Sequence, residues 1–118
     1  MVMGRAEGRV HLMYISQGMV GPGGEADLKR QELKPSRLGR TVFGDEEGSG
    51  LTVVDSPLGK LGALCCAEHV QPLTKAAMYA QGEQVHVAAW PSFSLYEFAS
   101  ALSHQVNNAV SRTYAVEG

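Results

Sequence analysis

The second half of the chain alternates between strand and helix patterns, and this alternation most limits the possible fold classes. Residues 60–66 (KLGALCC) form a short apolar run that is typical of a buried strand, and Val85–Ala89 (VHVAA) is a second one. Between them, residues 72–81 carry apolar residues at helical spacing, with proline at the first position and Gly82 just past the end. The apolar positions of this helix are Leu73, Ala76, Ala77 and Ala80. The order of elements predicts a mixed α/β fold.

The first half of the chain predicts hairpins. Residues 10–16 (VHLMYIS) are rich in β-branched and aromatic types and indicate a strand. The glycine-rich turn at 21–24 then predicts a return along residues 29–34, which Pro35 ends. Residues 51–55 (LTVVD) predict a further strand, which a turn at residues 56–59 pairs with 60–66.

A last helix is predicted after Trp90. Ser94 and Glu97 have the spacing of a capping box, in which each side chain accepts a backbone N–H of the first turn. An apolar stripe continues this helix to about Tyr114; its members are Leu95, Phe98, Leu102, Val106 and Ala109.

Composition excludes several classes of protein. A length of 118 residues favours one domain, and 44% hydrophobic with 19% charged residues lies in the ordinary globular range. Ten basic against twelve acidic residues leave no basic stripe, so no nucleic-acid partner is expected. No apolar run reaches the length of a signal or a transmembrane segment, so we expect no membrane partner and a cytoplasmic location.

The two cysteines, Cys65 and Cys66, are adjacent. Side chains of neighbouring strand residues point apart, so the pair forms no ordinary disulfide, and a reducing compartment is favoured. Alternation puts Leu64 and Cys66 on one face and Ala63 and Cys65 on the other, so the cysteines have different environments. One packs as a small apolar residue, and Cys66 is presented at the strand end, where α/β folds bind ligands. Burial of both is the ordinary alternative.

Other uses of these cysteines fit less well. A papain-like pair would require His86 or His104, yet nothing else resembles that family's cysteine segment. A metal site built from Cys65, Cys66 and His69 lacks the spacing that structural zinc prefers and a fourth ligand. We therefore predict neither a metal nor a cofactor.

Taken singly, the other polar and aromatic candidates have ordinary roles. Lys34 is by default an exposed lysine, and Glu68 a charge at the surface or at a helix N-terminus. His69 is by default a structural histidine, and Trp90 a core residue.

Taken together, these residues resemble the nitrilase family. The run 62–73 (GALCCAEHVQPL) is similar to the nucleophile segment of that family, and 80–91 (AQGEQVHVAAWP) is typical of its nitrilase branch. Residues 33–36 (LKPS) resemble the catalytic-lysine segment, and 111–118 the helix end after the nucleophile. The resemblance extends over residues 10–118 and is most specific over 66–91.

The resemblance implies a fold and a set of site residues. The fold is a four-layer α-β-β-α sandwich, of which residues 1–118 would be a partial carbon-nitrogen hydrolase domain. Cys66 would be the nucleophile, and Lys34 would stabilise the negative charge that develops during attack. The residues implied to bind substrate or support the site are Ala67, Glu68, His69, Trp90 and Pro91. The family's general-base glutamate precedes the lysine segment, so we expect it upstream of this chain; Glu7 resembles a different glutamate.

The implied reaction converts a small nitrile to a carboxylic acid and ammonia through a cysteine thioimidate and thioester, without a cofactor and in a homo-oligomer. An amidase of the same superfamily and a non-catalytic remnant stay open as alternatives. The chain departs from the family where Gln31 and Glu32 replace basic residues. It departs again at Gly39, where relatives have a glutamate that helps to hold the lysine. These departures favour a divergent or eroded member of the family.

Overall fold

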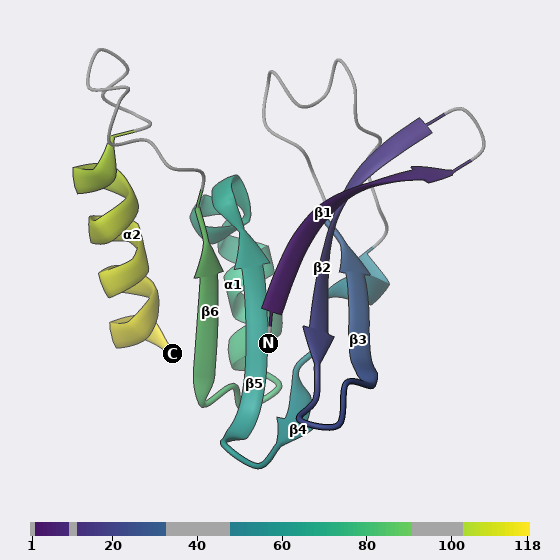
Figure 1. Cartoon of the computed structure of the whole chain (residues 1–118). Coiled ribbons are helices and arrows are strands. Elements are labelled where there is room, and N and C mark those ends of the chain that lie inside the picture. Colours follow the sequence, from purple (N-terminus) through teal and green to yellow (C-terminus); the bar gives the residue numbers. More distant parts are fainter. Residues whose placement is uncertain (1, 10–11, 33–47, 91–102) are drawn as a thin grey trace.

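The computed structural model describes residues 2–9, 12–32, 48–90 and 103–118. Two three-stranded sheets form its framework (Figure 1). The first sheet is antiparallel and consists of β1 (Val2–Arg9), β2 (Leu12–Val20) and β3 (Ala26–Gln31). The second consists of β4 (Val54–Ser56), β5 (Gly59–Cys65) and β6 (Val85–Ala89), with β5 antiparallel to β4 and parallel to β6.

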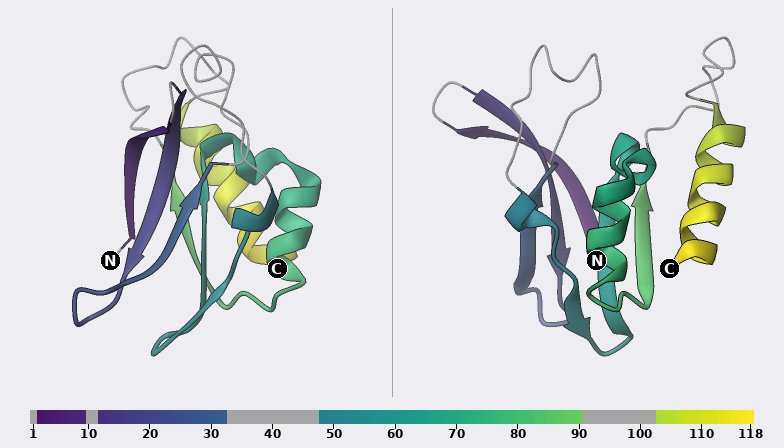
Figure 2. Two further views of the ribbon diagram at one scale, coloured as in Figure 1. Left: turned by 90° about the vertical axis from the view of Figure 1, so that its right-hand side faces the viewer. Right: turned by 180° about the vertical axis from the view of Figure 1, so that it is seen from behind.

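Helices follow the strands of the second sheet. Two short 3-10 helices, η2 (Gly48–Gly50) and η3 (Cys66–Val70), precede β4 and follow β5. The α-helices are α1 (Pro72–Tyr79) and α2 (His104–Glu117). The left view of Figure 2 shows three layers: the β1–β3 sheet, then the β4–β6 sheet, then both α-helices on the far side. This mixed α/β arrangement is the one expected for part of a four-layer sandwich.

The first sheet differs from the prediction at both of its outer strands. β2 contains most of the predicted strand 10–16 and continues to Val20. β1 was not predicted, and it pairs with β2 along its whole length. β3 ends at Gln31, earlier than the predicted 29–34; residues 33–35 lie outside the described part of the chain. Gly24 has φ +88, the left-handed conformation that makes glycine suitable for this turn.

The second hairpin and α1 agree closely with the sequence patterns. The strand predicted over 51–55 is shorter and starts at Val54, whereas the turn and the strand that follows it form as expected. Helix α1 begins with Pro72 at its first turn, and Gly82 beyond its end has φ +73. β6 has the predicted bounds.

The buried face of α1 was not the predicted apolar one. Leu73 is 85% exposed, whereas Thr74 and Met78 are buried. Ala76 and Ala80 are also exposed. Three of the four predicted residues therefore lie on the outer side, and Ala77 is half-buried, because hydrophobic spacing alone does not tell which face packs on the sheet.

Helix α2 is described from His104, with Ser103 as its N-cap residue accepting the backbone N–H of Val106 at 3.4 Å. The predicted cap residues Ser94 and Glu97 lie outside the described residues. Val106 and Ala109 of the predicted stripe are exposed, and α2 instead buries Asn107 and Tyr114.

The core lies between the β4–β6 sheet and the helices. Leu64, Met78 and Tyr114 are its buried centre, and Leu51, Val53 and Tyr79 pack around it. Gly62 lies against two side-chain ends: a Cβ there would meet Met78 Cε at 2.7 Å and overlap the Glu83 carboxylate, so both side chains would have to move. Within the described ranges, no helix is long and apolar enough to cross a membrane.

Candidate active site

Cys66 stands at the junction of β5 and η3. The strand ends one residue earlier than predicted, at Cys65, and Cys66 has φ 40, a left-handed conformation that is unfavourable for a residue with a Cβ. Cys65 is buried and Cys66 is half-buried. The sequence prediction that the two cysteines have different environments is confirmed. A strained residue at a strand tip is a frequent feature of functional sites.

The surroundings of Cys66 favour the neutral thiol over the thiolate. Burial is the main cause that raises the pKa of Cys66, and Glu32 and Glu68 raise it further. The backbone N–H of Ala67 donates to Cys66 and lowers that pKa. Burial, with Glu68 and Glu32, raises the pKa of Cys65 to about 12, so this neighbour stays protonated. Attack by Cys66 needs the thiolate, so a cation or further N–H donors must assist it.

Glu68 is not at the surface but fully buried, and a cation neutralises it. Its carboxylate accepts two N–H groups of Arg30 from β3, and its Oε2 atom accepts the backbone N–H of Cys65 at 2.8 Å. Arg30 is 3% exposed, and its Nη1 also donates to the Ala63 carbonyl at 3.0 Å and to Gln17 Oε1 at 3.1 Å. This ion pair joins the first sheet to the backbone of β5, so Glu68 lies inside the protein rather than at the surface.

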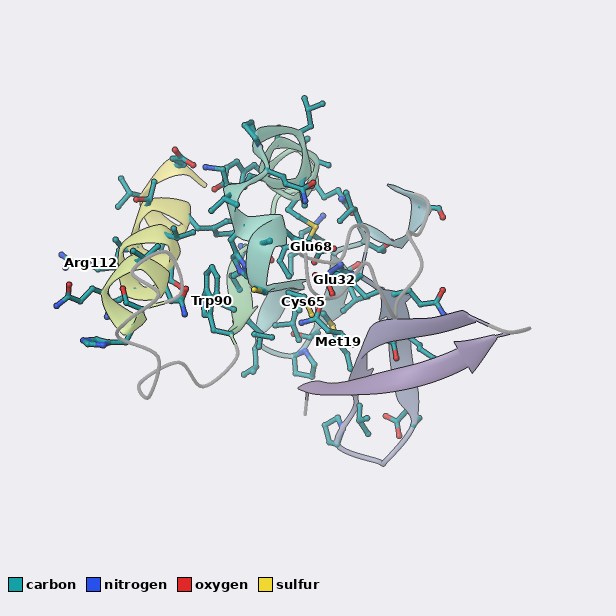
Figure 3. All side chains as sticks on the ribbon, turned by 90° about the horizontal axis from the view of Figure 1, so that it is seen from above. Met19, Glu32, Cys65, Glu68, Trp90 and Arg112 are labelled. Atoms are coloured by element: carbon teal, nitrogen blue, oxygen red, sulfur yellow. The ribbon has the colours of Figure 1, made fainter. Side chains whose placement is uncertain are left out.

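Glu32 is a buried acidic residue that the sequence indicated only as a departure from the family. It is 4% exposed, and Figure 3 shows it beside Cys65 and Glu68. Burial and then Glu68 raise the pKa of Glu32 to about 7, against a smaller lowering by Arg30. Arg30 and Glu32 are two residues apart, so strand alternation could have predicted that their side chains lie on the same face of the sheet.

His69 begins a chain of hydrogen bonds that starts at the Cys66 carbonyl group. Its Nδ1 lies 2.9 Å from the Cys66 carbonyl oxygen, and its Nε2 lies 2.9 Å from Nε2 of His86 on β6. His86 Nδ1 lies 2.7 Å from Glu83 Oε1, and the Tyr114 hydroxyl donates to the other oxygen of Glu83. Burial is the main cause that lowers the pKa of His69, which therefore favours its neutral form. His69 is the satisfied histidine that the sequence suggested, but its second partner was not foreseen.

Trp90 covers His69. The two rings are stacked with centroids 4.6 Å apart, and the Trp90 indole N–H donates to Ser111 Oγ on α2 at 2.8 Å. Trp90 also lines a hollow of about 430 Å³ on the α2 side. The residues lining it are Trp90, Asn107, Asn108, Ser111, Arg112 and Ala115.

The remaining predicted site residues divide in two groups. Ala67 belongs to η3 and contributes its N–H to Cys66. Lys34 and Pro91 lie outside the described residues, so the proposed cation of the site is not placed. Over the described ranges, no three or more His, Cys, Asp and Glu side chains are grouped to hold a metal ion.

The chain places a cysteine after a strand end, and a buried glutamate follows it two residues later. The model of the carbon-nitrogen hydrolase family matches residues 1–118, and the chain belongs to this family. A crystal structure of a carbon-nitrogen hydrolase from Helicobacter pylori G27 has the same fold, with a TM-score of 0.75 over 97% of this chain and 41% of that one, at 20% identity. The chain therefore has the nitrilase-like fold, as part of the α-β-β-α sandwich.

Similar sequences carry nitrilase names. A nitrilase of Pseudomonas syringae pv. syringae is 52% identical over 118 residues, which are 99% of this chain and 35% of that protein. An arylacetone-specific nitrilase of Alcaligenes faecalis is 50% identical over 107 residues, 90% of this chain and 30% of the relative. An aliphatic nitrilase of Rhodococcus rhodochrous is 42% identical, over 99% of this chain and 32% of its own length. The chain spans about a third of the length of these relatives.

Proposed function

We propose that this chain carries the nucleophile of a nitrilase and that Cys66 attacks the carbon of a small nitrile. The observation that supports this most is the Cys66 thiol itself. It is half-buried at the end of β5, with the Ala67 N–H donating to it, in a chain whose relatives are named nitrilases. A backbone N–H at this position favours the thiolate and then the anionic intermediates.

The proposed chemistry begins with sulfur–carbon bond formation. The Cys66 thiolate adds to the nitrile carbon, one C–N π bond breaks, and the nitrogen takes a proton to give a thioimidate. Water then adds to that carbon, the C–N bond breaks, and ammonia leaves a thioester. A second water hydrolyses the thioester to the carboxylic acid and restores the Cys66 thiol. The net reaction consumes one nitrile and two waters.

Two further groups are assigned by the resemblance alone. Lys34 would stabilise the negative charge that develops on nitrogen and oxygen. An ionised Glu32 carboxyl would disfavour that same charge. The general base would be a glutamate that matches no residue of this chain. General acid–base help contributes about 10²–10⁴-fold, so the 118-residue chain by itself is expected to turn over slowly at best.

A non-catalytic role is the second candidate, and one observation favours it. Glu32 adds a buried carboxyl beside the cysteines, while Arg30, the cation that lowers its pKa, is already paired with Glu68. Such a site stabilises the thiol and disfavours attack. An amidase acting through the same Cys66 is a third possibility, and comparing ammonia release from a nitrile with release from its amide distinguishes it.

The test measures the covalent adduct directly, because an adduct on Cys66 can be detected by mass without turnover. The chain is incubated with an arylacetonitrile and, separately, with an aliphatic nitrile, and its intact mass is measured. Addition without a leaving group raises the mass by that of the whole nitrile. We expect the adduct in the native chain and in Cys65→Ala, and its loss in Cys66→Ala. An adduct that persists in Cys66→Ala, or no adduct with either nitrile, would exclude the proposal.

Selective alkylation separates the non-catalytic alternative. Iodoacetamide should modify the Cys65→Ala variant faster than Cys66→Ala, since Cys65 is buried and its pKa is about 12. Equal rates would favour the non-catalytic role.

A further inference from the structure

The hydrogen bonds behind the nucleophile require a definite number of protons. The Cys66 carbonyl oxygen can only accept, so His69 Nδ1 carries a hydrogen and donates it over 2.9 Å. Burial, followed by Glu83, raises the pKa of Tyr114, so its hydroxyl stays protonated and donates to Glu83. His86 Nδ1 lies 2.7 Å from the other Glu83 oxygen, so one proton lies between these two atoms.

These assignments leave the two Nε2 atoms of His69 and His86 facing each other at 2.9 Å. A neutral imidazole with a hydrogen on Nδ1 has a bare lone pair on Nε2, and two lone pairs at this distance repel. A hydrogen bond there needs a proton between the rings. Glu83, His86 and His69 therefore hold together one proton more than an ionised carboxylate and two neutral histidines would hold. This count is the same whether the proton between Glu83 and His86 is assigned to the carboxyl group or to the ring.

The surroundings decide which ring holds the charge. His86 is in contact with the Glu83 carboxylate, which stabilises an imidazolium. His69 is buried under Trp90 and stacked against it, and its burial favours the neutral ring. Other titratable groups facing the pair are Glu68 from η3, Tyr114 from α2, and Tyr79, which lies behind Tyr114 on α1.

We infer that His86 is a cationic positioning residue, which donates through Nε2–H to His69 and thereby fixes the Cys66–Ala67 peptide group. That peptide is planar, so its C=O and N–H point in opposite directions. The C=O accepts from His69, and the N–H donates to Cys66. A donor on the C=O also polarises the peptide and strengthens its N–H as a donor.

The consequence is a link between β6 and the reactivity of the thiol. Cys66 is held in a left-handed conformation that it would not adopt unaided, so its peptide needs an external support. Loss of the His86 proton would replace a hydrogen bond by a repulsion and release that support. This inference deepens the proposed function, since it describes how the proposed nucleophile is held.

The decisive measurement counts protons and needs no variant. Nitrogen NMR of the full chain with isotope-labelled histidine reports which ring nitrogens carry hydrogen. At about pH 7.5 we expect both nitrogens of His86 and only Nδ1 of His69 to be protonated. One protonated and one bare nitrogen on both His69 and His86 would overturn the inference, whatever the outcome of the nitrile experiments.

Two variants test the source and the effect of the charge. Glu83→Gln keeps an acceptor for His86 but removes the anion, and the extra proton should be lost from the spectrum at the same pH. In a Cys65→Ala background, His86→Gln keeps an N–H donor for His69, whereas His86→Leu does not. We expect iodoacetamide to alkylate Cys66 about threefold more slowly in His86→Leu. A rate change of this size corresponds to part of the net free energy of one hydrogen bond. The rate should be restored in His86→Gln; equal rates in both variants would contradict the positioning role.

Discussion

Two buried carboxyl groups lie near the proposed nucleophile, and they differ in whether a cation neutralises them. Glu68 is paired with Arg30, so its charge is balanced where it stands. Glu32 shares that arginine only weakly, and its pKa rises to about 7 because burial disfavours its ionised form. The reactivity of the Cys66 thiol therefore depends on the protonation state of the Glu32 carboxyl.

Removing the Glu32 charge should activate Cys66. In a Cys65→Ala background, Glu32→Gln is expected to raise the rate of alkylation by iodoacetamide at about pH 8, because an ionised Glu32 opposes the thiolate. Glu25→Gln, an exposed position in the β2–β3 turn, is the matched control and should have no effect. An unchanged or slower rate in Glu32→Gln would mean that Glu32 does not oppose the thiolate.

Glu32 also predicts a pH dependence of stability. The folded chain holds the Glu32 proton up to about pH 7, whereas the ordinary carboxyl loses it at 4.5. The folded state thus binds more protons between these values, and the free energy of unfolding falls as pH rises from 4.5 through about 7. Urea unfolding should show that Glu32→Gln has a higher free energy of unfolding than the native chain at about pH 8. At about pH 5 this difference in free energy should be smaller. A gap that is the same at both values would contradict this.

The backbone of Cys66 predicts an unusual order of substitutions. Because its φ is 40, Cys66→Gly should be more stable than Cys66→Ala by about 1 kcal/mol. At Cys65, with φ −104, the order should reverse, since glycine only adds conformational entropy to the unfolded chain there. Thermal unfolding of the four variants gives the comparison, and the same order at both positions would show that the left-handed conformation is not maintained.

At the scale of elements, side chains of the first sheet contact β5 and η3 among the described residues near the site. Arg30 donates to Glu68 and to the Ala63 carbonyl, and Gln17 of β2 donates to the Leu64 carbonyl at 3.2 Å. The β5 backbone is thus held by side chains of the first sheet.

Breaking the ion pair of Arg30 and Glu68 should be costly. Arg30→Met leaves Glu68 buried without its cation and is expected to lower the free energy of unfolding by about 3–5 kcal/mol. The double variant Arg30→Met, Glu68→Met removes both charges and should lose less. Arg112→Met on the exposed side of α2 is the control and should be nearly neutral. Denaturant unfolding decides, and a double variant worse than Arg30→Met would contradict a paired charge.

Sequence patterns predicted the elements whose signals are local. Strand β6 and helix α1 were found because an apolar run, Pro72 and Gly82 mark them within a few residues. Strand β1 was missed because its charges and glycines carry no strand signal, and its pairing with β2 defines it. In the site, the different environments of the two cysteines were predicted from alternation, but the structure produces them by ending β5 at Cys65 and placing Cys66 in η3. The pairing of Glu68 with Arg30 joins positions 38 residues apart, which no spacing rule indicates.

At the scale of the whole molecule, the outer side of the helix layer carries apolar residues. Leu73 on α1 and Val116 on α2 are each 85% exposed, and Lys75 and Glu117 form an ion pair between the two helices. Val70 before α1 is also exposed. A surface of this kind fits the self-association expected from the sequence.

We predict that self-association uses this helix surface. Leu73→Lys should shift the chain toward smaller species in sedimentation velocity, because it places a charge where apolar area would be buried. Leu58, which is 78% exposed in the β4–β5 turn, is equally accessible but distant in the chain, so Leu58→Lys is the matched control. If Leu58→Lys alone reduced the size, the contact would lie elsewhere.

The absence of a side chain at Gly62 has a consequence for how far this molecule can vary. A methyl group there would push aside Glu83, which is held in place by both His86 and Tyr114. The smallest possible replacement on β5 would therefore disturb the histidine pair without touching it. Gly62→Ala is therefore expected to displace Glu83 and so to disturb the hydrogen bonds of His86 and His69. A strand residue without a functional group thus limits which side chains this cluster can accommodate.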